Sequence, residues 1–489
     1  MKAYLLGIDN GLTATKAVLY DLRGTQLGIA SLPTRPLSDQ TEHSEIDMTH
    51  QWRLCCSVIR QVLKQTAISP ADIAAIGVSG YGNGLHLLDK AGRPLGKGIT
   101  SMDHRASDLV ATFPEQHRKR LQELTLQDIW DGQPGMLARW MKINQSELYG
   151  QINAILLCKD WIQYRLTGKI STEYTDISAA GLLNNRTKAY DDTILELLDI
   201  PEMQACLPDV LESAQVAGTI THEAALQTGL SEGIPVVGGL FDVTANAIGS
   251  GLIRPGQLCM IAGTWNINIA LGRRAFIPKN IRQCTIYGDS DVFCYIDSSA
   301  TSASNLEWFL HQVLNKSCRY EEFERVIAEY APEDVDVLFL PFVHSGLKSD
   351  HPGAMFYGLK SIHGRNEMLR AIAEGIGFAH AYHIQNLQSE GIEQGDTVFF
   401  TGGASRNKQW CQMFADILQL NVAVPAVEQT GTLGDCIVTG VGAGIFPTIQ
   451  KAITQMVSVR EVYEPRANYA EGYRKKYGRF VDLLNRMIG

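Results

Sequence analysis

The sequence lacks several features that would assign it to common classes of protein. It has no basic surplus, because 43 Lys and Arg residues face 52 Asp and Glu residues, for a formal net charge of −9. A chain without excess positive charge is poorly suited to neutralise the phosphates of nucleic acid. Nor does any apolar run reach the length needed to span a membrane. We therefore expect neither nucleic acid nor a membrane as a partner.

Cysteine and histidine are present without the patterns that would give them a role. The ten cysteines are scattered and form no Cys-x-x-Cys pair, which argues against a disulfide framework and a zinc site. The histidines show no metal-ligand spacing, and we recognise no signal peptide. Reduced, buried thiols in a cytoplasmic protein fit these absences, and a homodimer stays open as the assembly.

The length and the order of the segments indicate an α/β protein with more than one domain. A chain of 489 residues is too long for one ordinary core. Strand, loop and helix patterns alternate along it, as an α/β fold requires. Glycine and proline cluster near residues 251–255, which predicts a first domain of residues 1–251 and a second of 252–489.

The first strong pattern is a polar turn between two short apolar strands, Tyr4–Ile8 and Ala17–Tyr20. The turn carries Thr13 and Lys16, so backbone N–H groups, a hydroxyl and an ammonium can face one anion, such as a phosphate. Asp9 would repel that anion, so it suggests Mg²⁺ held through water. Taken alone, the stretch fits an ordinary β-hairpin with a polar turn at least as well as it fits a phosphate-binding site.

Two later segments could bind the same ligand. Leu258–Leu271 repeats the order strand, Gly-Thr turn and strand, with Gly263 and Thr264 in the turn, which suggests two related domains. Thr401–Asn407 joins a strand to a helix through two glycines, and such a helix start favours a phosphate. Asn407 could contact a nucleoside or simply cap the helix.

Polar residues also follow two other predicted strands. Asp242 comes after the apolar strand Ile234–Gly239, where it could accept a proton from a substrate hydroxyl or cap the next helix. Asn83 lies in a glycine-rich loop after the strand Ile73–Val78. Asp103 could join Asn83 in binding a polyhydroxylated substrate, or form a surface ion pair with Arg105.

These segments together resemble the FGGY family of carbohydrate kinases, from Tyr4 to about residue 450. The stretch from Ile8 to Lys16 resembles the family's first phosphate motif, Gly263-Thr264 its second, and Thr401–Asn407 its adenosine motif. Asp242 falls where the family keeps its catalytic aspartate. The resemblance implies two ribonuclease H-like α/β domains facing a central cleft, as in actin and the chaperone ATPases.

The resemblance also implies ATP and Mg²⁺ as cofactors and a role for each candidate residue. Asp9 would hold Mg²⁺ through water, and Asp242 would take the proton of the attacking hydroxyl. The remaining candidates are Thr13, Lys16, Gly263 and Thr264 for the phosphates, Gly402, Gly403, Ala404 and Asn407 for the nucleoside, and Asn83, Asp103 and Asp242 for the sugar.

The chain departs from well-known members of the family in its sugar loop. Tyr81-Gly82-Asn83 stands where glycerol kinases carry Arg-Glu and D-xylulose kinases carry Met-His, and it looks closer to L-xylulose and erythritol kinases. Trp265 follows Thr264 where a small residue is usual, and Leu137 stands where the family has Lys. We expect phosphorylation of a small neutral ketopentose such as L-xylulose.

Other functions stay open at this point. A polyol such as erythritol or glycerol comes second, and an aldonate such as gluconate comes last, because Ser79–Leu87 contains no Lys or Arg to pair with an acid. A carboxylate kinase is a weaker alternative. An ATPase switch of the actin or chaperone type is the non-kinase alternative, and the polar set Asn83, Asp103 and Asp242 argues against it.

Overall fold

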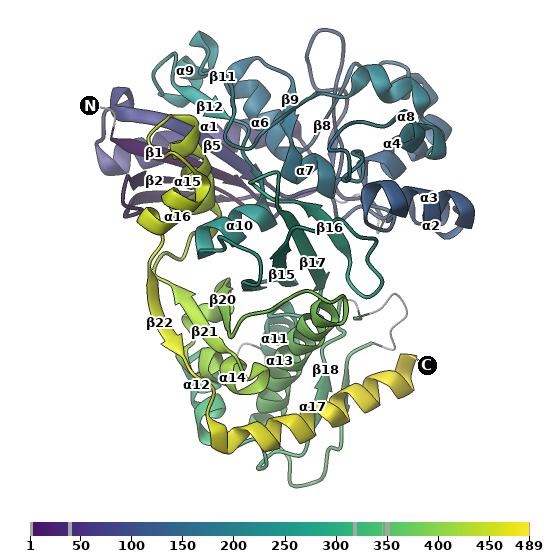
Figure 1. Cartoon of the computed structure of the whole chain (residues 1–489), viewed down its shortest axis with the longest axis vertical. Coiled ribbons are helices and arrows are strands. Elements are labelled where there is room, and N and C mark those ends of the chain that lie inside the picture. Colours follow the sequence, from purple (N-terminus) through teal and green to yellow (C-terminus); the bar gives the residue numbers. More distant parts are fainter. Residues whose placement is uncertain (1–2, 38–41, 316–319, 345, 348–352, 489) are drawn as a thin grey trace.

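A computed structural model describes residues 3–37, 42–315, 320–344, 346–347 and 353–488. It contains two seven-stranded sheets, one in each half of the molecule (Figure 1). The first runs in the order β11-β12-β5-β1-β2-β3, with β13 beside β5. Its strands are β1 (Tyr4–Asn10), β2 (Ala14–Asp21), β3 (Gln26–Pro33), β5 (Ile73–Gly80), β11 (Val216–Thr219), β12 (Pro235–Val237) and β13 (Leu240–Phe241).

The second sheet repeats the centre of the first. β14 is antiparallel to β15 and parallel to β20, as β1 is antiparallel to β2 and parallel to β5. The repeat predicted from the Gly-Thr turns is therefore confirmed, and with it the two-domain α/β fold. The strands of the second sheet are β14 (Leu258–Ala262), β15 (Asn266–Gly272), β16 (Gln283–Ile286), β17 (Phe293–Ser299), β20 (Thr397–Thr401), β21 (Asn421–Pro425) and β22 (Val459–Tyr463).

Helices cover the first sheet and build a lobe beside it (Figure 1). α1 is capped by Asp47, which accepts a bond from His50 N at 2.9 Å, and it buries Trp52, Cys55 and Ile59 on one face. The helices here are α1 (Met48–Thr66), α2 (Ser107–Ala111), α3 (Glu115–Thr125), α4 (Pro134–Asn144), α5 (Ser146–Tyr149), α6 (Cys158–Thr167), α7 (Tyr174–Ala179), α8 (Asp192–Leu197), α9 (His222–Thr228) and α10 (Asp242–Ser250). Short strands join them: β4 (Glu45–Ile46), β6 (His86–Leu88), β7 (Gly98–Ile99), β8 (Ala154–Leu156), β9 (Ser171–Glu173) and β10 (Asp209–Leu211).

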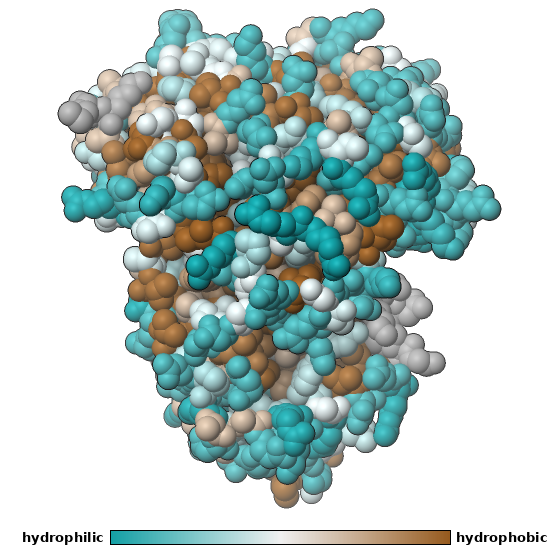
Figure 2. All heavy atoms as spheres, in the orientation of Figure 1, coloured by the Kyte–Doolittle hydropathy of each residue, from teal (hydrophilic) through white to brown (hydrophobic). Residues whose placement is uncertain are grey.

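The second half is built around the long central helix α13, and its last helix, α17, lies across the end of the molecule (Figure 1). Hydrophilic residues cover much of the face in Figure 2, interspersed with smaller apolar groups. Within the described ranges, no helix is both long and apolar enough to cross a bilayer. The elements are α11 (Ser304–Trp308), a π-helical turn (Phe309–Val313), α12 (Tyr320–Glu329), β18 (Leu338–Leu340), β19 (Met355–Tyr357), α13 (Arg365–Ser389), α14 (Lys408–Leu418), α15 (Thr430–Gly442), α16 (Ile449–Met456) and α17 (Ala467–Ile488).

One predicted strand is shorter than expected. The apolar run Ile234–Gly239 was expected to form one continuous strand, but β12 ends at Val237 and β13 begins at Leu240. Gly239 lies between them with φ +81°, a left-handed conformation that interrupts a strand. The break moves the chain along β5, so that Phe241 pairs with Gly80 just before Asp242.

Helices α10 and α15 cross at very short distance where the two halves meet. A Cβ atom added at Gly249 would lie 1.8 Å from Thr430 O, and one added at Gly434 would lie 2.0 Å from Ala245 O. Glycine at these two positions therefore lets the backbones of the two helices pack directly against each other. α15 also packs against β1 and β5, beside them in Figure 1, so the division at residue 251 stays a prediction.

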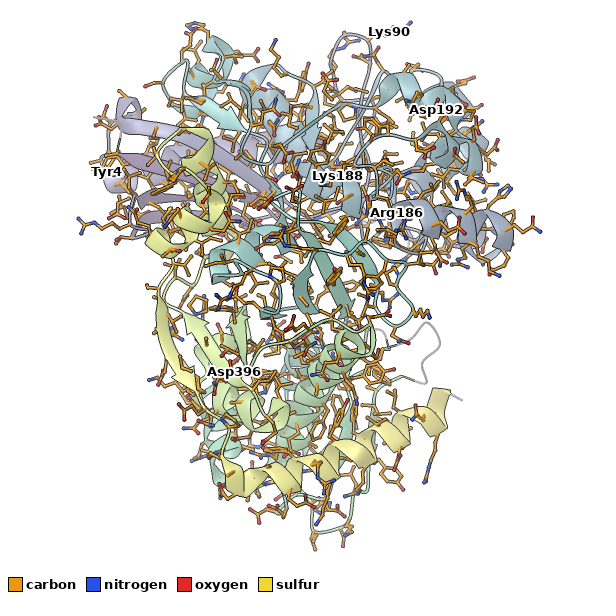
Figure 3. All side chains as sticks on the ribbon, viewed as in Figure 1. Tyr4, Lys90, Arg186, Lys188, Asp192 and Asp396 are labelled. Carbon is orange, nitrogen blue, oxygen red and sulfur yellow. The ribbon has the colours of Figure 1, made fainter. Side chains whose placement is uncertain are left out.

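A second junction ties the lobe of the first half to β16. Cys284 N donates to Leu126 O at 3.0 Å, and Arg186 Nη1 donates to Ala275 O at 3.1 Å. Lys188 Nζ lies 3.1 Å from Asp291 Oδ1. Arg186 and Lys188 lie where the upper and lower halves meet in Figure 3. The two halves are thus joined at a second place besides the crossing of α10 and α15.

We expect Gly434→Ala to destabilise the protein, because its methyl group would overlap the backbone of α10. Overpacking of this kind typically costs about 1–3 kcal/mol, measurable as a lower denaturation midpoint. The control is Gly478→Ala in α17, where an added Cβ meets nothing within 4 Å and alanine should favour the helix by about 1 kcal/mol. Equal midpoints for the two variants would contradict the role given to the helix crossing.

Candidate active site

The first predicted phosphate loop lies between β1 and β2. Asp9 pairs with Lys16 across the hairpin, and Lys16 Nζ lies 3.4 Å from Asp9 Oδ2. Thr13 is exposed in the turn. Thr15 is buried instead, and it donates to Asn10 Oδ1 at 2.9 Å. Asp9, Thr13 and Lys16 can therefore meet a ligand, whereas Thr15 holds the hairpin together.

The second loop occupies the matching position between β14 and β15. Gly263 N donates to Trp265 O at 3.2 Å, and Thr264 is exposed. A Cβ atom at Gly263 would meet nothing within 4 Å, so the backbone here borders open space. Trp265, which replaces a small residue of the family, is 37% exposed. Both turns of the repeat thus remain accessible to a ligand.

The predicted nucleoside loop begins at the end of β20. Gly402 has φ +95°, and an added Cβ would lie 2.6 Å from Ala262 O, so a side chain there would meet β14. Gly403 borders open space, and Ala404 is buried. Asn407 Oδ1 accepts a bond from a backbone N–H in the first turn of α14 at 2.9 Å. Its Nδ2 has no partner within the part of the chain that the structure describes, so Asn407 caps the helix and still offers a donor.

A cavity of about 190 Å³ joins the first and third of these loops. Asp9 and Lys16 line it from the first sheet, Gly402 and Gly403 from the second, and Thr430–Thr432 from the start of α15. A helix N-terminus favours an anion through its free N–H groups and its dipole. The sequence analysis did not identify Thr430–Thr432 as candidate ligand contacts, although the pair Gly431-Thr432 was a usable signal.

Asp242 is the first residue of α10, at the carboxyl end of β13. β13 lies beside β5, and the same stretch of β5 pairs Ser79 with Asp9. The three strands therefore deliver Asp242 and Asp9 to one edge of the sheet. The N-cap position of α10 belongs to Phe241, whose side chain makes no capping bond, and Asp242 follows it as the first helical residue.

The surroundings of Asp242 raise the pKa of its carboxyl group to about 8. Burial is the main cause and the charge of Asp9 the next, while the Val243 N–H and Lys16 act in the opposite direction. Both main causes disfavour the charged form of the acid. A carboxyl group with a pKa near neutrality is suited to exchange a proton with a substrate.

Asn83 lies in a tightly folded loop after β5. Its φ is +63°, that of Gly84 is +72°, and a Cβ at Gly84 would lie 2.5 Å from Ile99 O. Asn83 is buried, with 6% of its surface exposed, and its Oδ1 has no partner among the described residues. Buried polar atoms without partners are uncommon in folded proteins, so this oxygen is a candidate ligand contact.

Asp103 and Arg105 form a buried ion pair, and the surface pair considered as an alternative is wrong. Arg105 Nε lies 2.7 Å from Asp103 Oδ1, and both side chains are at most 2% exposed. Asp103 also accepts bonds from Ser44 N, Arg105 N and Arg105 Nη2. Four bonds fill the acceptor sites of a carboxylate. Asp103 therefore holds its loop, and a direct sugar contact would need one of these bonds to break.

A third aspartate near Asp9 and Asp242 was missed from the sequence. Asp435, on the face of α15 that covers β5, accepts a bond from Ser79 Oγ at 2.8 Å. Burial raises the pKa of its carboxyl group, and the charges of Asp9 and Asp242 add to the rise. Asp435 lies in a helix of small and apolar residues, where a lone carboxylate was the available signal.

Comparisons with known proteins agree with this geometry. The profile of the FGGY family of carbohydrate kinases matches in two parts, its N-terminal domain over residues 4–249 and its C-terminal domain over residues 258–443. The chain is 35% identical over 486 residues to a probable L-xylulose kinase of Haemophilus influenzae, covering 98% of both chains. It is 34% identical over 493 residues to the L-xylulose/3-keto-L-gulonate kinase of Escherichia coli, covering 100% of this chain and 98% of the relative.

Solved structures match the fold along nearly the whole chain. A ligand-bound xylulose kinase from Lactobacillus acidophilus superposes with a TM-score of 0.91 at 23% identity, covering 99% of this chain and 98% of the other. A xylulose kinase from Rhodospirillum rubrum gives a TM-score of 0.89 at 24% identity with the same coverage. The fold, the order of the motifs and the family profiles lead to one conclusion: the chain belongs to the FGGY family of carbohydrate kinases.

Proposed function

We propose that this enzyme transfers the γ-phosphate of ATP to a hydroxyl group of a small neutral ketose, with an L-xylulose-like ketopentose first. The observation that carries the proposal is the position of Asp242, at the sheet edge that it shares with Asp9 and Lys16. A proton acceptor, an anion-binding hairpin and a cleft between two domains are the parts that phosphoryl transfer to a hydroxyl requires.

The phosphates of ATP would lie between the two hairpins. Thr13 and Lys16 would bind them from the first half, and Gly263 and Thr264 from the second. The open backbone at Gly403, the cavity beside it and the free Nδ2 of Asn407 support a nucleoside at the far end. In phosphoryl transfer, such positioning and charge neutralisation do most of the catalytic work.

Asp9 fits a magnesium site of the kind found with nucleotides. The described residues include no ready-made cluster of three or more metal-ligating side chains. Mg²⁺ keeps several waters and needs one or two protein carboxylates plus substrate phosphates, so a single Asp9 at the cavity wall suffices. Bound there, Mg²⁺ would neutralise phosphate charge.

Asp242 would act as the general base toward the sugar hydroxyl. In the free enzyme its raised pKa leaves it mostly protonated at neutral pH. Lys16, which already acts to lower that pKa, favours the charged form. Asn83 would orient the sugar, and Asp103 would keep the neighbouring loop in place through Arg105.

The identity of the sugar follows from the loop and from the relatives. The two relatives at 34–35% identity described above carry L-xylulose in their names, and one adds 3-keto-L-gulonate, a sugar acid. Ser79–Leu87 contributes no Lys or Arg to hold an acid group. A neutral amide such as Asn83 suits a hydroxyl or carbonyl group better than a carboxylate.

We expect Asp242→Asn to bind ATP and sugar normally and to lose roughly 10²–10⁴-fold in kcat, as loss of a general base typically does. In the wild type, kcat/KM for the sugar should rise about tenfold per pH unit and level off above pH 8, because the base form accumulates as pH passes the pKa of about 8. A kcat within a few-fold of the wild type in the variant would remove Asp242 from the proton transfer.

Asp9→Ala should weaken binding of Mg²⁺–ATP by about 10–100-fold, since ligands of a metal and their close partners carry effects of this size. Sugar affinity should stay the same, which isothermal calorimetry can measure for each ligand separately. Asp21→Ala is the matched control, because Asp21 lies at the opposite end of the same hairpin. Parallel losses for nucleotide and sugar would indicate a folding defect.

Substrate choice can be tested with an ADP-release assay over ketopentoses, polyols and aldonates. An L-xylulose-like ketopentose should have the highest kcat/KM, erythritol should follow, and gluconate should come last. Asn83→Ala should raise KM for the sugar about tenfold through the lost hydrogen bond, with KM for ATP nearly unchanged. The proposed substrate class fails if an aldonate gives the highest kcat/KM.

A further inference from the structure

A buried cluster of charges lies beneath the sugar loop. Lys159 is completely buried, and its Nζ lies 2.5 Å from Asp160 Oδ1, 3.7 Å from Glu173 Oε1 and 3.7 Å from Asp176 Oδ2. One ammonium therefore faces three carboxylates. An excess of buried negative charge is unfavourable unless protons or hydrogen bonds compensate it.

Two of the three carboxylates have the hydrogen bonds that they need. Glu173 accepts four, from Thr175 N, Thr175 Oγ1, Asp176 N and Ser213 Oγ. Asp160 accepts one from Leu157 N as well as that from Lys159. These bonds account for Asp160 and Glu173 as structural residues, which cap helices α6 and α7.

Asp176 is different, because neither of its carboxyl oxygens has a hydrogen-bond partner among the described residues. It is fully buried, and Lys159 lies beyond hydrogen-bond distance. Burial raises the pKa of its carboxyl group and Lys159 acts in the opposite direction, while the charges of Asp160, Glu173 and Asp242 add to the rise. When it is protonated, a carboxyl group can both donate and accept a hydrogen bond.

The carboxyl group of Asp176 lies against the loop that carries Asn83. A Cβ atom added at Gly82 would be 3.3 Å from Asp176 Oδ1 and 2.5 Å from the ring of Phe241. Gly82 precedes Asn83 and Phe241 precedes Asp242, so Asp176 borders the backbone beside both proposed sugar contacts. The unpartnered, buried Oδ1 of Asn83 is an independent sign that a polar ligand completes this region.

The same segment is connected to the catalytic aspartate. Thr175 Oγ1 donates to Glu173 and accepts a bond from Phe241 N at 2.8 Å. The residue before Asp176 thereby fixes the residue before Asp242. A ligand bound between Asn83 and Asp176 would consequently be held in a fixed position relative to the proposed base.

We propose that Asp176 is a sugar-binding residue, whose carboxyl group hydrogen-bonds a hydroxyl or carbonyl oxygen of the substrate beside Asn83. The inference rests on the proposed function, because it needs a polyhydroxylated substrate at this place. It assigns to Asp176 the free carboxyl group that the sequence reading placed at Asp103, whose acceptor sites are all occupied.

The test compares Asp176→Ala and Asp176→Asn with the wild type. Asp176→Ala should raise KM for the sugar about 10- to 100-fold, while KM for ATP stays unchanged. The dissociation constant of the sugar, measured by calorimetry without ATP, should rise by the same factor. Asp176→Asn, which keeps one donor and one acceptor, should fall between Asp176→Ala and the wild type. Both variants should fold, since Lys159 keeps two carboxylate partners. Monodeoxy analogues of the best sugar, each lacking one hydroxyl group, extend the test. The analogue that lacks the group contacted by Asp176 should bind to the wild type and to Asp176→Ala with equal affinity.

Asp160→Asn is the matched control from the same cluster, and it should lower the melting temperature while leaving the sugar KM within twofold. The inference is overturned if the Asp176 variants keep the sugar KM within twofold of the wild type, or if they lose sugar and ATP affinity together. The proposed function itself would be overturned, and the inference with it, if the wild type neither bound nor phosphorylated any ketose or polyol.

Discussion

The close crossing of α10 and α15 is the contact on which the arrangement of the site depends. Glycines at 249 and 434 let the two backbones approach to a distance that no side chain would allow. Because α10 begins at Asp242 and α15 begins at the cavity wall, this crossing sets the proposed base against the proposed anion site. A small separation of the helices would alter both positions at once, which is how a hinge between two domains can control catalysis.

The electrostatics of the site follow from that geometry. The charge of Asp9 raises the pKa of Asp242, and the charges of Asp9 and Asp242 raise the pKa of Asp435. Burial of Asp242 and Asp435 removes the water that would screen these interactions. This excess of negative charge favours proton uptake, and the Mg²⁺ proposed to bind with ATP would supply a compensating cation. Ionisable groups with shifted pKa values of this kind are common at catalytic sites.

Much of the fold was predictable from local patterns. The Gly-Thr turn at Gly263 and Thr264 indicated the repeat because strand, turn and strand are read from adjacent residues, and the two sheets confirm it. The break in the strand before Asp242 was missed because a glycine such as Gly239 permits a bend but does not require one. Asp176 was missed because nothing in its neighbourhood along the sequence distinguishes it from a surface aspartate.

The sequence by itself determined the family, the two-domain α/β plan and the turns that we propose face the phosphates, since each is encoded within a few consecutive residues. Tertiary structure decided which carboxylates are free to act. Asp103 is saturated by Arg105 and Ser44, while Asp176 has no hydrogen-bond partner among the described residues. The physical reason is that hydrogen-bond saturation and desolvation depend on groups distant in the chain, which only folding brings together.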